Sequence, residues 1–133
     1  MTNGLSVFKK FITGAFVASL LLTASIASAQ DYFGSIYFSP ATGVDGFSYD
    51  YGTHREARQR ALNECINAGG TDCVEATWFR NACGALAVGA NNGWGSHWGN
   101  NRNGAEYNAM RTCNQNARGC AIVRWVCTAG ASN

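Results

Sequence analysis

A chain of 133 residues has room for one domain of ordinary size. Its ten basic and eight acidic residues leave a formal net charge of only +2. Nucleic acids and anionic membranes attract surfaces with a larger excess of basic charge, so we expect neither as a partner.

The first thirty residues have the order of a secretory signal peptide. A basic head at Lys9 and Lys10 precedes an apolar run over residues 11–26, and the small residues Ala-Ser-Ala follow at 27–29. This order predicts a signal peptide over residues 1–29 and one exported domain over residues 30–133. The alternative is an uncleaved anchor, but spanning a membrane needs ~20 strongly apolar residues, and polar residues interrupt this run.

Removal of the leader changes the charge of the chain. Both lysines are lost, so eight arginines balance eight acidic residues in the exported part. We therefore expect a neutral domain in the periplasm or outside the cell, with no attachment to the membrane after cleavage.

All six cysteines fall in the exported part, at positions 65, 73, 83, 113, 120 and 127. An even number of cysteines in a short exported chain is typical of a disulfide framework. A metal site is the alternative, but it needs close Cys-x-x-Cys pairs or nearby histidines. The cysteines here are seven or more residues apart and the chain has only two histidines, so we expect no metal and no cofactor.

The chain contains an internal duplication. The segment at residues 46–52, ahead of Cys65, matches the segment at residues 93–99, ahead of Cys113. Further positions agree: Ala57 with Ala105, Ala61 with Ala109, Leu62 with Met110, Cys73 with Cys120 and Trp78 with Trp125. So many agreements predict two halves of the same structure.

Each half, about residues 34–80 and 84–127, predicts the order strand, strand, helix, strand. Aromatic or β-branched runs joined by Gly, Asn or Pro turns indicate a hairpin. A helix then begins at Thr53, which can form a capping box with Glu56, and at Asn101 in the second half. The expected strands are 35–39, 47–51, 73–79, 85–88, 94–98 and 120–127. The sequence therefore predicts an α+β domain with pseudo-twofold symmetry.

The duplication also selects among the fifteen ways of pairing six cysteines. If the halves fold alike, one bond in each half joins the end of the helix to the following strand, and the last two cysteines pair with each other. The expected bonds are Cys65–Cys73, Cys113–Cys120 and Cys83–Cys127.

Several segments of the exported part resemble a known family. They are GSIYFS at 34–39, GFSY at 46–49, WFRNACGALA at 78–87 and the stretch 119–127 with its final Trp-Val-Cys. They resemble the bacterial exported family catalogued as domain of unknown function 4189, over about residues 32–127. The resemblance implies a small extracytoplasmic domain with no assigned activity, and the family supplies no catalytic residues that could be carried over to this chain. The Asn-rich stretch at 91–103 is longer and more polar than the family pattern.

That Asn-rich stretch supplies the best candidate ligand site. Indole faces beside amide and charged groups suit stacking and hydrogen bonding to a sugar or a peptide. The candidate residues are Trp94, His97, Trp98, Asn100 and Arg102, together with Arg80. The alternative is structural: Trp94 and Trp98 would line the buried face of a strand, and Arg80 would reach backbone carbonyls at a corner.

Catalytic residues have weaker support. Neither His54 nor His97 has an evident partner in the sequence, the cysteines are committed to disulfides, and the carboxylates show no spacing typical of a glycosidase pair. We therefore favour a non-enzymatic binding domain, inhibitor-like or immunity-like, whose partner is another exported protein or a cell-envelope glycan. The alternative is a small cell-wall or glycan-directed hydrolase built on Trp94, His97 and Trp98.

Overall fold

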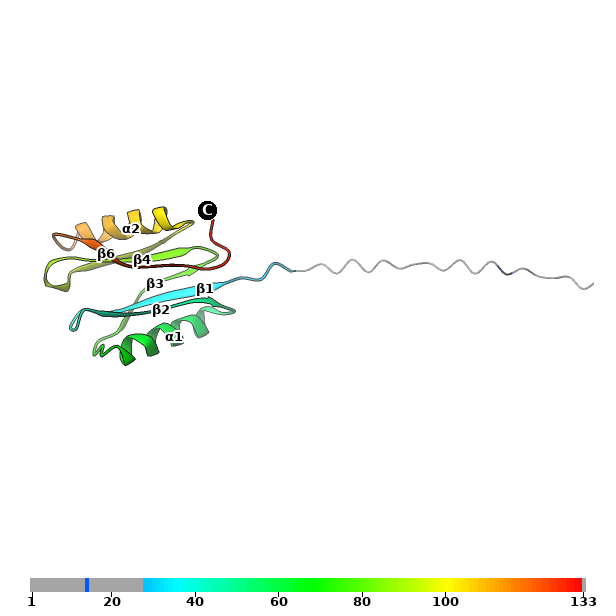
Figure 1. The fold of residues 1–133 in the computed structure, drawn as a ribbon, viewed down its shortest axis with the longest axis horizontal. Coiled ribbons are helices and arrows are strands. Elements are labelled where there is room, and N and C mark those ends of the chain that lie inside the picture. Colours follow the sequence, from blue (N-terminus) through cyan, green and yellow to red (C-terminus); the bar gives the residue numbers. More distant parts are fainter. Residues whose placement is uncertain (1–13, 15–27, 133) are drawn as a thin grey trace, which may run out of the picture.

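Two copies of one four-element unit make up the fold (Figure 1). The computed structural model describes Gly14 and residues 28–132, so the predicted signal peptide, residues 1–29, lies almost entirely outside the described residues. The elements are β1 (Phe33–Ser39), β2 (Val44–Tyr51), α1 (His54–Asn67), β3 (Val74–Arg80), β4 (Cys83–Val88), the 3-10 turn η1 (Ala90–Asn92), β5 (Trp94–Gly99), α2 (Arg102–Asn114) and β6 (Ala121–Cys127). This order confirms the predicted α+β class and the repeated strand–strand–helix–strand unit.

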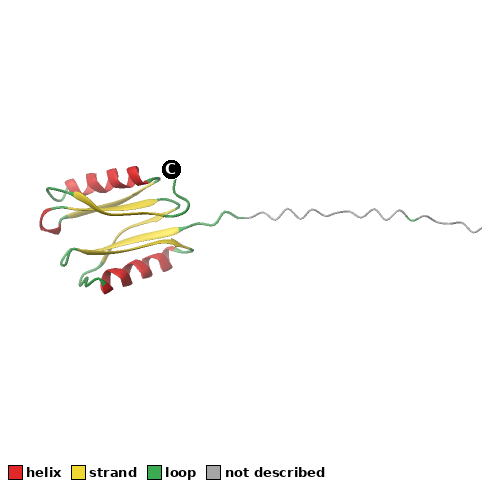
Figure 2. Ribbon diagram, in the orientation of Figure 1, coloured by secondary structure: helices red, strands yellow, loops and turns green. Residues whose placement is uncertain are grey.

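Each unit forms an antiparallel three-stranded sheet that carries its own helix on the outer side (Figure 2). The strand orders are β2-β1-β3 and β5-β4-β6, so the first strand of each unit is central. The sheets face each other, with β3 lying against β5 and β6 in contact with β2. A twofold rotation that exchanges the units also exchanges these two contacts, as pseudo-twofold symmetry requires.

The helices begin where the capping residues predict. The Thr53 side chain accepts a hydrogen bond from the Glu56 amide at 3.2 Å, and the Asn101 side chain accepts one from the Gly104 amide at 2.9 Å. Each bond satisfies an amide that the first helical turn leaves unpaired. The buried positions are small in both helices: Ala57, Ala61 and Cys65 in α1, and Ala105, Ala109 and Cys113 in α2. Each helix can therefore lie close to its sheet.

This close packing requires a glycine in β2 and in β5. A Cβ atom at Gly46 would overlap the backbone nitrogen of Cys65, and one at Gly95 would overlap that of Cys113. Gly46 therefore corresponds in space to Gly95, and the sequence alignment of Gly46 with Gly93 is wrong by two residues. Contact with the helix sets the register of these strands, and similarity of strand composition does not reveal it.

The main core lies between the two sheets. Its buried members are Ile36, Phe38, Phe79, Ala82, Leu86 and Val126. Phe79 is only 1% exposed, and a Cβ atom at either Gly34 or Gly84 would overlap its ring. Glycine at these positions of β1 and β4 therefore makes room for the ring between the central strands.

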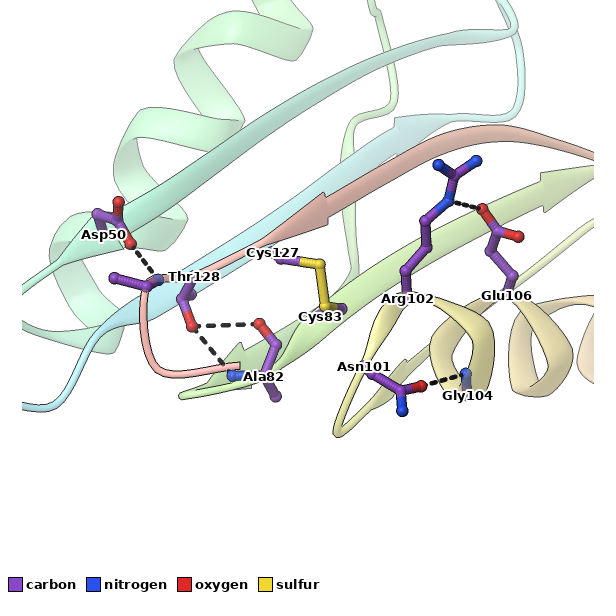
Figure 3. Close-up of a disulfide and its surroundings, with 10 residues drawn as sticks. Asp50, Ala82, Cys83, Asn101, Arg102, Gly104, Glu106, Cys127 and Thr128 are labelled. Atoms are coloured by element: carbon purple, nitrogen blue, oxygen red, sulfur yellow. Dashed lines mark hydrogen bonds and ion pairs between the residues drawn. A yellow bond between two sulfur atoms is a disulfide. The ribbon is translucent and has the colours of Figure 1, made fainter. Parts of the chain in front are cut away.

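All six cysteines are paired, as Cys65–Cys73, Cys113–Cys120 and Cys83–Cys127. These are the pairs expected from the duplication. The first two join the end of a helix to the region where the next strand begins, whereas the third joins β4 to β6 (Figure 3). Beyond β6, the Thr128 hydroxyl is hydrogen-bonded to the Ala82 amide at 3.0 Å and to its carbonyl oxygen at 3.1 Å. These bonds hold the end of the second unit against the link between the units.

Candidate functional site

The two tryptophans of β5 have different surroundings. The ring of Trp94 is partly buried: it packs edge-on against Phe38, with centroids 5.8 Å apart, and against the core between the sheets. Trp98, by contrast, is 47% exposed. The buried-strand interpretation therefore describes Trp94, whereas Trp98 presents much of its indole to solvent.

Trp98 forms one wall of a hollow along β3. The other lining residues are six consecutive positions, 75–80, which include Trp78 and Arg80. We call this site the β3–β5 hollow. Trp78 is 45% exposed, and the Arg80 side chain is 58% exposed, with its Nη1 3.7 Å from Asp31 Oδ2. The fold thus brings the candidates Arg80 and Trp98 together from different units.

A second, smaller hollow lies on the other side of Trp98, beside the start of α2. Its lining includes His97, Asn100 and Asn108. The carbonyl oxygen of Trp98 accepts a hydrogen bond from Asn108 Nδ2 at 3.1 Å and lies 2.8 Å from His97 Nδ1. His97 and Asn100 are therefore neighbours of Trp98, and the recorded hydrogen bond of His97 holds the backbone of β5.

Arg102 lies apart from this group. Its Nε donates to Glu106 Oε1 at 2.7 Å, and its guanidinium carbon lies 3.9 Å from the centre of the Trp125 ring. Figure 3 shows the Arg102–Glu106 pair beside the Cys83–Cys127 disulfide. Of the six candidates, the structure places Trp98 with Arg80 in the β3–β5 hollow and with His97 and Asn100 in the smaller one, and it places Trp94 and Arg102 elsewhere.

The sequence did not reveal a polar cluster that holds Trp78. His54, in the first turn of α1, stacks on the Trp78 ring with centroids 4.6 Å apart, and its Nε2 lies 3.1 Å from Glu75 Oε2. The same carboxylate oxygen accepts a 2.7 Å hydrogen bond from the fully buried Ser35 hydroxyl. The expectation that neither histidine has a partner is therefore wrong for His54.

Comparison of the two units shows that part of this cluster is special to the first. Counting from the matched cysteines, His54 and Trp78 correspond to Arg102 and Trp125, which also stack. Glu75 corresponds to Ile122, which packs in an apolar cluster of the second unit. The sequence could have revealed the cluster through this difference between the repeats, because a carboxylate at Glu75 stands where the second unit has the apolar Ile122.

The arginine next along the same helix face is also tied to the cluster. A hydrogen bond with Tyr37, together with the charges of Tyr37 and Glu75, raises the pKa of Arg58 above its ordinary value. The Arg58 guanidinium, which is charged at physiological pH in any case, therefore adds a positive charge near the Glu75 carboxylate. Tyr37 itself is 96% removed from solvent, at 4% exposure, so the contact links the rim of the cluster to the sheet beneath α1.

The junction between β6 and β2 differs from its pseudo-twofold counterpart. There, Arg124 Nε donates to Asp45 Oδ2 at 2.7 Å and the guanidinium carbon lies 4.4 Å from the centre of the Phe47 ring. The residue at the matching position of β3, four residues after the matched cysteine, is the short Thr77. A long side chain therefore occupies one junction, and the β3–β5 hollow opens at the other.

The groups in and around the β3–β5 hollow suit recognition more than catalysis. They offer two exposed indoles, a guanidinium, a hydroxyl and a carboxylate that already accepts two hydrogen bonds. Within residues 28–132 there is no group of three or more His, Cys, Asp or Glu side chains placed to hold a metal ion. No helix in the same part of the chain is long and apolar enough to cross a membrane.

Comparisons with known proteins bear on the family and the fold. The model of a family described as "Domain of unknown function (DUF4189)" matches residues 33–127, which confirms the resemblance seen in the sequence. Among solved structures, the NMR structure of Rv1813c from Mycobacterium tuberculosis is similar, with a TM-score of 0.53 and 26% identity over 96% of this chain and 94% of that one. No curated protein matches significantly.

Proposed function

Since the chain belongs to the DUF4189 family, whose description names no activity, we propose a function from the site itself: an exported, non-enzymatic domain that binds another exported protein through the β3–β5 hollow. The observation that carries this proposal is the pair of exposed indoles, Trp78 and Trp98, beside the exposed Arg80. Tryptophan and arginine are the residues most enriched where protein interfaces derive their binding energy.

Export is supported by two independent features of the chain. The N-terminal sequence has the order of a signal peptide, and all six cysteines form disulfides, which persist in oxidising compartments and are rare in the cytosol. Three disulfides stabilise the folded domain by constraining the unfolded chain, which suits an inhibitor-like or immunity-like protein.

The fixed position of Trp78 also supports binding. His54 stacks on its ring on one side of the sheet, and Glu75 holds His54 in place. A side chain that is already held loses little conformational entropy when a partner covers it, so more of the contact energy contributes to affinity.

The hydrolase alternative has less support from the geometry. A hydrolase built on a histidine needs that histidine beside a carboxylate and an accessible nucleophile. The recorded hydrogen bond of His97 goes to a backbone carbonyl. His54 does meet Glu75, but among residues 28–132 the only hydroxyl bonded to that carboxylate belongs to Ser35, which is fully buried.

The test compares matched surface variants of the oxidised domain, residues 30–133, immobilised and exposed to an envelope extract. Trp98→Ala removes one wall of the hollow, whereas Tyr49→Ala removes a ring of similar exposure, 51%, at the corresponding position of the first unit. We expect quantitative mass spectrometry to show at least a tenfold loss of captured partner for Trp98→Ala and less than a twofold change for Tyr49→Ala.

Equal capture of the partner by the unmodified domain, Trp98→Ala and Tyr49→Ala would contradict the proposal. Binding of purified envelope polysaccharide in place of protein, with the same dependence on Trp98, would assign the hollow to a glycan. Hydrolytic turnover of such a polysaccharide that is lost in Glu75→Gln, with an unchanged thermal midpoint, would establish the hydrolase.

A further inference from the structure

The lining of the β3–β5 hollow has an unusual pattern, because six consecutive residues of one strand, 75–80, reach it. Successive side chains of a strand point to opposite faces of its sheet. A hollow on one face would therefore be lined by every second residue. The β-bulge of β3 at Ala76 disturbs this alternation only locally. Six consecutive residues can share a hollow where it runs along the edge of the strand, which both faces and the backbone border.

β3 is such an edge. Its sheet has the order β2-β1-β3, so β3 pairs with β1 along one side and, in the part of the chain that the structure describes, has no strand of that sheet along the other. On an antiparallel edge, every second residue directs its amide and carbonyl outward, where they can pair with a further strand. Trp98, reaching in from β5, stands beside this edge and forms the far wall of the hollow.

We propose that the β3–β5 hollow binds an extended peptide segment of the partner protein as an added strand along β3, with an acidic side chain of that segment facing Arg80. This inference rests on the proposed function and names the part of the partner that the hollow accepts. Main-chain hydrogen bonds to β3 supply affinity, and the side chains that flank the edge supply selectivity.

The charges of β3 explain the acidic preference. Glu75 and Arg80 lie near opposite ends of the strand, and charged residues on an edge discourage unwanted pairing with other strands. The Glu75 carboxylate is already engaged by Ser35 and His54. Arg80 forms only a long ion pair with Asp31, at 3.7 Å, and its side chain is 58% exposed, so its guanidinium can also meet a carboxylate of an incoming strand.

The pseudo-twofold counterpart provides an internal control. β6 is also an edge strand, in the order β5-β4-β6. Its Arg124 points at Asp45 of β2 and occupies the junction that corresponds to the hollow. The added strand therefore pairs with the edge of β3 and does not pair with the edge of β6.

The test uses a displayed library of random nine-residue peptides, selected on the oxidised domain and counter-selected on Trp98→Ala. We expect enriched sequences with alternating β-branched or aromatic residues, an acidic residue and no central proline. A synthetic version should slow amide hydrogen exchange in β3 at least tenfold at saturation, without slowing it in β6. Selection on Arg80→Glu should replace the acidic residue by a basic one.

N-methylation of the peptide separates main-chain pairing from side-chain stacking. Methyl groups on alternate amides should weaken binding about tenfold or more in one register, because two or three hydrogen bonds are lost, and change it less than threefold in the other. Failure to enrich any peptide, or enriched peptides that leave exchange in β3 unchanged, would overturn strand addition. If capture from the envelope extract still depended on Trp98 in that case, the proposed binding function would stand and only the strand addition would be excluded.

Discussion

The fit of Phe79 between two glycines makes a quantitative prediction about the core. The ring is 1% exposed between the sheets, and a Cβ atom at Gly84 would overlap it, with Ile36 Cδ1 the next neighbour at 3.3 Å. Phe79→Ala should lower the free energy of unfolding by about 3–5 kcal/mol, through lost burial and the cavity left behind. Gly84→Ala should lower it by about 1–3 kcal/mol, because the new methyl group and the ring compete for one space.

The double variant distinguishes this explanation from a general loss of packing. In Phe79→Ala the space of the ring is free, so the methyl group of Gly84→Ala fills part of the cavity. The double variant should therefore be no less stable than Phe79→Ala alone, which gives a coupling energy of about 1–3 kcal/mol between residues of two different units. Any change in the intrinsic strand preference of residue 84 cancels in the cycle.

The assay is urea unfolding of the oxidised domain, with all four proteins compared at equal m-values. If Phe79→Ala does not fold, Phe79→Leu completes the same cycle with smaller changes. Additive effects within ~0.5 kcal/mol would refute the reasoning, since they would mean that Gly84 and the ring do not share a space.

Four further outcomes are expected. A double-mutant cycle on the partly buried pair Asp45–Arg124, with Asn and Gln replacements, should give a coupling energy of about 1 kcal/mol or more in urea unfolding. The exposed pair Arg60–Glu64 should give less than ~0.5 kcal/mol. A larger coupling energy for Arg60–Glu64 than for Asp45–Arg124 would be evidence against the junction. Serine replacement of both Cys83 and Cys127, 44 residues apart, should lower the free energy of unfolding by about 4 kcal/mol, against about 2.5 kcal/mol for Cys65 and Cys73, 8 residues apart. Peptide mapping without reductant should find these pairs, and a bond from Cys65 to the second unit would contradict them. Intact mass of protein from the periplasm or medium should match a chain that starts near Gln30, and recovery of the full-length chain in membranes would exclude cleavage. His97→Ala should change capture from the envelope extract less than twofold, and a loss comparable to that of Trp98→Ala would place His97 in the binding surface.

Local features of the sequence were sufficient for the elements and their order. The capping residues Thr53 and Asn101 lie at the observed helix starts, and the aromatic and β-branched runs lie in the observed strands. These features act over one or two turns of chain, so their effect can be derived without knowing the rest of the fold. The duplication then extended the local inferences to the cysteine pairs, because equal halves place equivalent cysteines at equal distances.

Only the tertiary structure decided which residues meet between the units. The register of β5 depends on Gly95 beneath α2, and Trp98 is exposed on a strand that lies at the edge of its sheet. The stacking of His54 on Trp78 depends on how α1 lies beside β3. Each is a contact between segments that are far apart in the chain or lie on different elements. A pattern of period two or four specifies which face of an element is buried, but the neighbour on that face follows from the packing of the whole domain. The hollow lined by Arg80 and Trp98 has the same origin, because the two residues come from different units and the twofold arrangement of the sheets brings them near each other.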